Sequence, residues 1–243
     1  MTDFTLPESL KKLNTHYCPG CGHGIIHRLL AEVIDELKIR ENTIAIAPVG
    51  CAVFGYFYWD FDTAEAAHGR PPAVATGIKR VLPDKVVITY QGDGDLAAIG
   101  GNELLHAAHR GENISILFVN NACYGMTGGQ MAPTTLPRQV TTTTPEGRGK
   151  EDGNPVKVCE LLSSIEGVSY LERVAVDTPS NILKAKKAIH KALTYQLNKK
   201  GFSLVEFLAM CPTGWRVKPN KSRELIANKM TDFYPLGVYK DID

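Results

Sequence analysis

The sequence has almost no excess of charge of either sign. Its 27 Lys and Arg residues stand against 26 Asp and Glu residues, which leaves a formal net charge of +1 over 243 residues. It also has no basic tract interleaved with aromatic residues, which is a usual mark of a nucleic-acid-binding surface. These absences argue against nucleic acid as a partner.

Long apolar runs are missing as well. No stretch reaches the roughly 20 apolar residues that a membrane-spanning helix needs. Residues 1–17 are polar and of mixed charge, without the basic start and apolar middle of a signal peptide. We therefore expect a cytoplasmic protein with no membrane partner. In that reducing compartment the six cysteines are expected as ligands or free thiols rather than as disulfides.

No internal repeat and no interdomain linker interrupts the chain. We expect a single domain over residues 1–243, with a short N-terminal arm (1–15) and a C-terminal arm (about 214–243). The connection 131–154 is rich in Thr, Pro and Gly. A connection of that length without regular structure is usually functional or mobile.

Apolar periodicity predicts alternating strands and helices. Strands are expected over residues 43–48, 86–90, 114–119, 168–174 and 202–208, and helices over residues 25–37, 73–81, 96–109, 156–165 and 180–197. This alternation predicts the α/β class, with a mostly parallel sheet and helices on both faces.

The most informative stretch is 86–130, which reads as strand, acidic glycine turn, helix, strand and polar turn. The first strand ends at Gly92-Asp93-Gly94, and the second ends at Asn120-Asn121. Because parallel strands end on the same edge of a sheet, we expect Asp93 and Asn121 to lie side by side. A carboxylate and an amide oxygen suit Mg²⁺, which would take its remaining ligands from a diphosphate and water.

The cysteines form a second constellation. Cys18 and Cys21 form a C-x2-C pair, and Cys51 and Cys211 each follow a strand that is expected to end on the same sheet edge. Four thiolates suit either an iron–sulfur cluster or zinc, and buried free thiols would explain Cys51 or Cys211 alone. Cys159 lies in a helical pattern and is expected in the core.

The spacing GDG-x(about 25)-NN resembles the thiamine diphosphate motif, and GDGDLAAIG…NNACYGMTGGQMAPTT resembles the β subunit of 2-oxoacid:ferredoxin oxidoreductases. The resemblance covers roughly residues 17–215. It implies the diphosphate-binding module of thiamine enzymes, with Mg²⁺ held by Asp93, Asn121 and the backbone carbonyl of Cys123. In the contexts CPGCGH, VGC and CPT, it implies a [4Fe–4S] cluster on Cys18, Cys21, Cys51 and Cys211.

Further residues are expected at the cofactor through these motifs, through a helix start at Cys21-Gly22-His23, and through an HGR segment at His68. The expected cofactor-binding set is Gly22, His23, Gly50, Cys51, His68, Gly92, Asp93, Gly94, Asp95, Asn121, Tyr124, Gly125, Met126 and Thr127. Arg70, in the same HGR segment, could hold a carboxylate or phosphate, or be a solvated surface charge.

The resemblance also implies what the chain lacks. The glutamate that promotes ylid formation in thiamine enzymes belongs to a separate pyrimidine-binding module, so it is expected from an α subunit and no catalytic residue is assigned here. The implied activity is the coenzyme A-dependent oxidative decarboxylation of a 2-oxoacid, with electrons passing through the cluster to ferredoxin. γ and δ subunits are possible further partners.

Three other functions compete with this reading. A non-oxidative thiamine decarboxylase or synthase would not need four cysteines. A non-catalytic iron–sulfur electron-transfer subunit would not need Asp93 and Asn121. A nicotinamide-binding protein would need a third glycine after Gly92-Asp93-Gly94.

The substrate is open between 2-oxoisovalerate, 2-oxoglutarate and pyruvate. An apolar segment, 52–57, would favour a branched-chain 2-oxoacid if it lines the substrate pocket. Arg70, or a base on the partner, could instead select the second carboxylate of 2-oxoglutarate.

Overall fold

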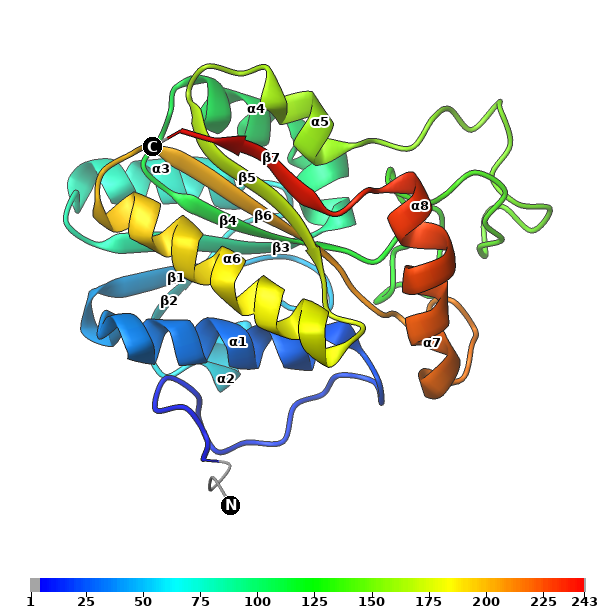
Figure 1. The fold of residues 1–243 in the computed structure, drawn as a ribbon, viewed down its shortest axis with the longest axis horizontal. Coiled ribbons are helices and arrows are strands. Elements are labelled where there is room, and N and C mark those ends of the chain that lie inside the picture. Colours follow the sequence, from blue (N-terminus) through cyan, green and yellow to red (C-terminus); the bar gives the residue numbers. More distant parts are fainter. Residues whose placement is uncertain (1–4, 243) are drawn as a thin grey trace.

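The computed structural model describes residues 5–242, and a single seven-stranded sheet with helices on both faces organises them (Figure 1). The strands are β1 (Thr43–Ala47), β2 (Asp62–Glu65), β3 (Val86–Gly92), β4 (Ser115–Asn120), β5 (Val168–Ala175), β6 (Phe202–Leu208) and β7 (Gly237–Asp241). Their order across the sheet is β2-β1-β3-β4-β6-β5-β7, and every neighbouring pair is parallel except β5 and β7. The expected α/β class with a mostly parallel sheet is confirmed.

Helices cover both faces of this sheet. They are α1 (Gly22–Leu37), α2 (Gly55–Tyr58), α3 (Pro71–Val81), α4 (Gly101–His109), α5 (Val158–Ser163), α6 (Pro179–Leu197), α7 (Pro219–Leu225) and α8 (Thr231–Phe233), with short 3₁₀ or π segments η1 (Arg40–Asn42), η2 (Gly94–Ile99) and η3 (Ile226–Met230). Helices α1 and α6 pack on one face, and α3, α4 and α5 pack on the other (Figure 1). Among the described residues, no helix combines the length and the apolar character needed to cross a bilayer.

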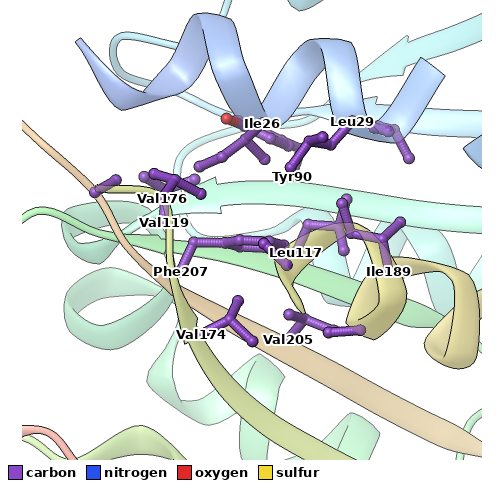
Figure 2. Close-up of a cluster of buried hydrophobic side chains, with 14 of the residues drawn as sticks. Ile26, Leu29, Tyr90, Leu117, Val119, Val174, Val176, Ile189, Val205 and Phe207 are labelled. Carbon is purple, nitrogen blue, oxygen red and sulfur yellow. The ribbon is translucent and has the colours of Figure 1, made fainter. Parts of the chain in front are cut away.

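The central strands are buried on both faces, which explains why they read as continuous apolar runs rather than alternating ones. Every residue of β4 and β6 is buried. Figure 2 shows Ile26 of α1 and Ile189 of α6 on the side of the sheet where Leu117 and Phe207 project. Phe207 is fully buried, so truncation to Ala is expected to destabilise the fold by about 3–5 kcal/mol.

The expected helix over 96–109 is interrupted in the structure. A π-helical turn, η2, ends at Ile99, and α4 begins at Gly101. The junction is Gly100, whose N–H donates to the Asp95 carbonyl at 3.0 Å, the five-residue spacing of a π turn. A Cβ at Gly100 would lie 2.4 Å from that carbonyl oxygen, so the junction requires glycine.

The C-terminal segment (about 214–243), which was expected to be an arm without regular structure, contains helices and a strand. The segment folds into α7, η3 and α8, and β7 then pairs antiparallel with β5 as an edge strand. Ile226 and Met230 are buried, which attaches these helices to the body of the protein. Edge strands are half exposed and short, so the apolar pattern of β7 was too weak to identify, as was that of the other edge strand, β2.

The described part of the N-terminal arm is also fixed to the body. Ser9 donates from its backbone N–H to Asp35 of α1, and Leu10 forms a bridge with Trp59. The first four residues of the expected arm lie outside the described residues.

The parallel strands bring their carboxyl ends to one edge. Gly92 pairs with Val119, and Asn120 pairs with Leu208, so the turns after β3, β4 and β6 emerge together. In Figure 1, α7 and α8 lie at this end of the sheet, close to the long connection after β4.

Candidate functional site

A cavity of about 220 Å³ opens at the carboxyl edge of the sheet. All of the residues expected at the cofactor line it, except Gly22. Gly22 instead packs beneath the site, where its N–H donates to the Met210 carbonyl at 3.0 Å. Three apolar residues that were not expected, Pro48, Val49 and Ile99, also line the cavity, together with Ala52 of the segment considered for the substrate pocket. They follow β1 or end η2. No sequence motif marks them, and only the topology of the sheet places them together at the cavity.

Asp93 is the buried carboxylate of this cavity, with 3 % of its surface exposed. One oxygen accepts from the Gly94 N–H at 3.1 Å, and the other accepts from the Thr134 hydroxyl at 2.8 Å. Burial nevertheless raises the pKa of Asp93 to about 7, because these bonds only partly replace water. A cation beside this carboxylate would offset that burial.

The two side chains of the Asn120-Asn121 turn lie in different surroundings. Asn120 points into the core and donates to Glu206 at 2.8 Å, while its own oxygen accepts from the Ala122 N–H at 3.2 Å. Asn121 lines the cavity, and its backbone carbonyl accepts from the Trp215 indole at 2.7 Å. Ala122 has φ +55, so the turn places a non-glycine residue in the left-handed region.

The Asn120 side chain is held in turn by a buried ion pair. Arg173 and Glu206 are both fully buried and lie 2.9 Å apart. Glu160 pairs with the same guanidinium at 2.5 Å. The network fixes Asn120, and therefore the turn that presents Asn121.

Asp95 uses both of its oxygens within the protein. One accepts from the N–H groups of Val49 and Gly69 and lies 2.5 Å from His68 Nδ1, while the other accepts from Gln91 at 2.6 Å. Asp95 therefore joins the turn after β1, the HGR segment and η2 around the cavity. Its carboxylate is committed to these donors.

His23 lines the cavity from the first turn of α1. Its Nδ1 lies 2.8 Å from the Tyr90 hydroxyl, and its ring stacks on Tyr17 with centroids 5.1 Å apart. Burial lowers the pKa of His23 to about 4, so this imidazole is neutral at pH 7.

The two candidates for substrate selection lie mostly outside the cavity. Arg70 does not line the cavity; it pairs with Glu103 and its side chain is 47 % exposed. In segment 52–57, Ala52 lines the cavity, whereas Phe57 is 52 % exposed and stacks on Phe54. The rest of the apolar wall comes from Pro48, Val49 and Ile99.

Five of the cysteines gather at or beside the cavity, whereas Cys159 lies in the core on α5, as expected. All six are free thiols, of which Cys18 is exposed and Cys211 is buried. Burial raises the pKa of the Cys21 and Cys51 thiols to about 12 in each case, and neighbouring thiols, Cys211 and Cys18 among them, add to the shift. A Cβ at Gly125 would lie 3.0 Å from the Cys211 sulfur and 3.5 Å from the Cys51 sulfur, so glycine leaves room where these thiols meet.

Within residues 5–242, no three His, Cys, Asp or Glu side chains surround a single point as the ligands of one metal ion do. Tetrahedral zinc, with Zn–S distances of about 2.3 Å, would draw its four sulfurs tightly together. A cuboidal [4Fe–4S] core is larger than one ion and takes one sulfur at each iron. Four thiols are chemically suited to either group.

The long connection 131–154 is anchored by a buried arginine. Arg148 donates to the carbonyls of Ala132, Pro133, Thr135 and Gly153. This anchoring explains how a segment without helix or strand keeps a defined conformation.

The same connection reaches the cavity through two threonines. Thr134 donates to Asp93, and Thr135 donates to the Ala122 carbonyl at 2.7 Å. Tyr234, from the C-terminal helices, donates to the Thr134 carbonyl at 2.7 Å. Sequence reasoning assigned no role to Thr134; the one available signal was its place in the MAPTT run that follows YGMTGGQ.

Comparisons with known proteins agree with this geometry. Residues 49–207 match the family described as thiamine pyrophosphate enzyme, C-terminal TPP binding domain, thiamine pyrophosphate being thiamine diphosphate. The chain is 50% identical over 228 residues to the ketoisovalerate oxidoreductase subunit VorA of Methanothermobacter thermautotrophicus, covering 93% of this chain and 48% of the relative. It therefore spans about half the length of that relative.

Two further relatives are covered more fully. The 2-oxoglutarate synthase subunit KorB of Methanocaldococcus jannaschii is 40% identical over 201 residues, which cover 81% of this chain and 69% of the relative. A solved 2-oxoglutarate:ferredoxin oxidoreductase from Magnetococcus marinus, with 2-oxoglutarate, coenzyme A and succinyl-CoA bound, superposes with a TM-score of 0.79 at 26% identity. That match covers 100% of this chain and 87% of the solved one. The chain thus belongs to the family of thiamine diphosphate-binding subunits of 2-oxoacid:ferredoxin oxidoreductases.

Proposed function

We propose that this protein is the β subunit of a 2-oxoacid:ferredoxin oxidoreductase that forms acyl-coenzyme A and passes electrons to ferredoxin. The observation that supports this most strongly is the meeting of two donor sets at one sheet edge. Asp93 and Asn121 line the cavity, and the thiols of Cys51 and Cys211 lie against Gly125 in its wall. A non-oxidative decarboxylase has no use for the second set, and an electron-transfer subunit has no use for the first.

Asp93, Asn121 and the Cys123 carbonyl are proposed to hold Mg²⁺, which in turn holds the diphosphate of the cofactor. The pKa of Asp93, about 7, marks a buried carboxylate that a divalent cation would keep ionised. The cofactor, when bound, supplies a carbanion that attacks the 2-oxo carbon and accepts the electrons released with carbon dioxide. Gly94 and the Tyr124–Thr127 turn line the cavity where a diphosphate would contact the backbone.

Cys18, Cys21, Cys51 and Cys211 are proposed to hold the [4Fe–4S] cluster. Cys51 lies in the cavity wall, so the cluster would adjoin the cofactor pocket. Cys18 is exposed, which would leave one corner of the cluster near the protein surface. Together these positions offer a path for single electrons from the cavity to an external acceptor such as ferredoxin.

The cavity is proposed to be half of the active site. Among the described residues that line it, Asp93 and Asp95 are the carboxylates, and there is no glutamate to contact an aminopyrimidine ring. Asp95 uses both of its oxygens within the protein, and Asp93 is assigned to Mg²⁺. A partner subunit carrying the pyrimidine-binding module is therefore required, and we take residues 5–242 as one domain that docks against it.

The cavity wall favours an apolar 2-oxoacid such as 2-oxoisovalerate. Its apolar residues include Pro48, Val49, Ala52 and Ile99, and no Lys or Arg of the described chain lines it to pair with a second carboxylate. 2-Oxoglutarate is the competing substrate, because the KorB relative is named a 2-oxoglutarate synthase subunit and the solved neighbour has 2-oxoglutarate bound. In that case the basic group must come from the partner subunit.

The test is the complex of this chain with its partner subunit, purified without oxygen. Iron, sulfide, magnesium and bound thiamine diphosphate are quantified, and ferredoxin reduction is assayed with 2-oxoisovalerate, 2-oxoglutarate and pyruvate. We expect about four irons per chain and the highest kcat/KM with 2-oxoisovalerate. A colourless, zinc-containing complex would refute the electron-transfer role, and a preference of about tenfold or more for 2-oxoglutarate, about 1.4 kcal/mol, would refute the apolar-pocket assignment alone.

A further inference from the structure

One buried imidazole in the cavity wall has an open nitrogen. His23 is 3 % exposed, and its Nδ1 lies 2.8 Å from the Tyr90 hydroxyl. Its Nε2 has no hydrogen-bond partner among the described residues, yet it is not sealed off by protein atoms as the unpaired Nδ1 of His27 is, one turn further along α1. Because His23 lines the cavity, we take its Nε2 to open toward the cavity.

The hydroxyl of Tyr90 determines which nitrogen of His23 carries the proton. Tyr90 is fully buried, and within residues 5–242 its hydroxyl bonds to His23 Nδ1 alone. If Nδ1–H donated to the phenol oxygen, the O–H of Tyr90 would be left in the core without an acceptor, which buried hydroxyls avoid. The phenol therefore donates, Nδ1 accepts, and the single imidazole proton is on Nε2. The cavity is thereby provided with a neutral N–H donor.

The ring of His23 is also held in place by its neighbours. It stacks on Tyr17 with ring centroids 5.1 Å apart and planes at 19°, and the Tyr90 ring lies 5.7 Å away. The preceding residue, Gly22, fits tightly against the end of β6, because a Cβ there would lie 2.7 Å from that of Ala209. The donor is therefore preorganised, as are the groups that stabilise developing charge in enzymes.

The other polar side chains of the cavity leave the substrate few donors. Most of them already have a partner or an assigned ligand: Asp93, Asn121, Asp95, His68 and Thr127. The ring of Tyr124 lies over Gly94, on the side assigned to the diphosphate. His23 instead enters from α1, on the face of the sheet opposite to α4. Its Nε2–H is therefore available to a second molecule beside the cofactor.

We propose that His23 is a catalytic residue whose Nε2–H donates a hydrogen bond to the oxygen on C2 of the 2-oxoacid, and that Tyr90 is the positioning residue that keeps the proton on Nε2. This inference rests on the proposed function. When C2 of the acid is attacked, the electron pair of its C=O bond moves onto that oxygen, and a donor already aimed at it binds more strongly as the charge develops. The proton stays on Nε2 throughout. Every 2-oxoacid carries this oxygen, so the inference holds whichever acid is preferred.

The experiment compares the wild-type complex with the variants His23→Leu, His23→Gln, Tyr90→Phe and Tyr17→Phe. His23→Gln keeps an N–H donor, and Tyr90→Phe removes the hydroxyl that bonds to Nδ1. Tyr17→Phe is the matched control, because it removes a hydroxyl of the same aromatic cluster that lies 3.0 Å from His27 Nε2 and does not bond to His23. Ferredoxin reduction gives kcat and KM for the 2-oxoacid that the wild type prefers.

A second readout requires no turnover. The complex is loaded with Mg²⁺ and deazathiamine diphosphate, an analogue that cannot form the carbanion, and then with the preferred 2-oxoacid carrying ¹³C at C2. The infrared difference between labelled and unlabelled acid isolates the C2=O stretch of the bound substrate. A hydrogen bond from Nε2–H weakens this C=O bond and therefore lowers the wavenumber of the stretch.

We expect His23→Leu to lower kcat by about 100-fold with a smaller change in KM, as for the loss of one donor to a developing oxyanion. The C2=O band should move to higher wavenumber. Tyr90→Phe should lower kcat by about 2- to 10-fold and broaden the band, because the ring then populates both tautomers. His23→Gln should recover part of both losses, and Tyr17→Phe should match wild type. A role confined to packing would separate neither Gln from Leu nor the two tyrosine variants.

Each contrary outcome has a distinct meaning. A wild-type complex that binds thiamine diphosphate but reduces ferredoxin with none of the 2-oxoacids refutes the proposed function itself. An active wild type whose C2=O band is unchanged in His23→Leu refutes this inference alone. If His23→Leu does not fold or loses iron, the tyrosine variants decide, because equal bands in Tyr90→Phe and Tyr17→Phe contradict a proton directed by Tyr90.

Discussion

Thr134→Val tests whether the long connection orients the proposed magnesium ligand. Thr134 is fully buried, and its hydroxyl donates to Asp93 at 2.8 Å. Valine has nearly the same shape, so the change removes the hydrogen bond with little change in packing. A hydrogen bond to a charged group contributes about 1.5–3 kcal/mol. The variant loses part of this energy in both the metal-free and the metal-bound protein, and that part cancels in the binding free energy. We expect the net effect on Mg²⁺–thiamine diphosphate affinity to be about 1–2 kcal/mol, or roughly 5- to 30-fold in Kd.

The measurement is isothermal titration of chelator-treated complex with Mg²⁺ and thiamine diphosphate, at several pH values. Without the Thr134 hydroxyl, the pKa of Asp93 should rise above about 7, since one of the bonds that lower it is gone. Binding at pH 7 should then release more protons from Thr134→Val than from wild type. Thr134→Ser keeps the hydroxyl and is the matched control. Equal affinity and equal proton release in Thr134→Val and wild type would show that Thr134 does not orient Asp93.

Four further changes test other parts of the site. Asp93 has a folded-state pKa of about 7, above its unfolded value, so the free energy of unfolding of the cofactor-free protein should fall by roughly 2–4 kcal/mol as pH rises from about 4 to 7. Asp93→Asn should flatten this pH dependence in urea unfolding, and an unchanged dependence would contradict the assignment. Arg148→Met leaves several buried carbonyls unpaired and should destabilise the protein by about 3 kcal/mol, with new proteolytic cleavage within 131–154; resistance equal to wild type would argue against anchoring by Arg148. Asn120→Ala should weaken cofactor binding although Asn120 points away from the cavity, because it leaves one oxygen of Glu206 without its donor and frees the turn. Unchanged affinity in the titration above would count against this. Cys18→Ser should lose iron while keeping the wild-type circular dichroism spectrum, because Cys18 is exposed and adds little to the core; full iron content would remove it from the ligand set.

The central βαβ unit was predictable because its pattern and its topology constrain each other. Continuous apolar runs identify β3 and β4, and parallel pairing then places Asp93 and Asn121 on the same edge. This placement follows from strand pairing alone and requires no knowledge of side-chain contacts. The same logic placed Cys51 and Cys211 beside them, since β1 and β6 end on that edge.

The sequence was less informative wherever a contact depends on the path of an irregular segment. Thr134 meets Asp93 from 41 positions further along the chain, through a connection that has no periodicity. The direction of Asn120 depends on Glu206, which lies in a strand expected only to fill the core. Edge strand β7 carries so short a pattern that the C-terminal segment appeared to be an arm.

The residues expected to line the substrate pocket also depended on the path of an irregular segment. Phe54 and Phe57 are apolar and follow a proposed cluster ligand, which made them reasonable candidates for the pocket wall. The short helix α2 turns Phe57 outward, and the wall is built by Val49 and Ile99 instead. Composition near a motif therefore predicted the apolar character of the pocket but not the residues that provide it.

The buried supports of the site explain why its two halves should respond to each other. Arg173, Glu206 and Asn120 hold the turn from the core, and Thr135 holds the Ala122 carbonyl from the long connection. Trp215 then ties the Asn121 carbonyl to the segment that follows Cys211. Because the proposed magnesium turn and the proposed cluster loop share these contacts, a displacement of one must move the other. Loss of the cluster should therefore weaken cofactor binding even though no cysteine side chain is proposed to bind the cofactor's metal.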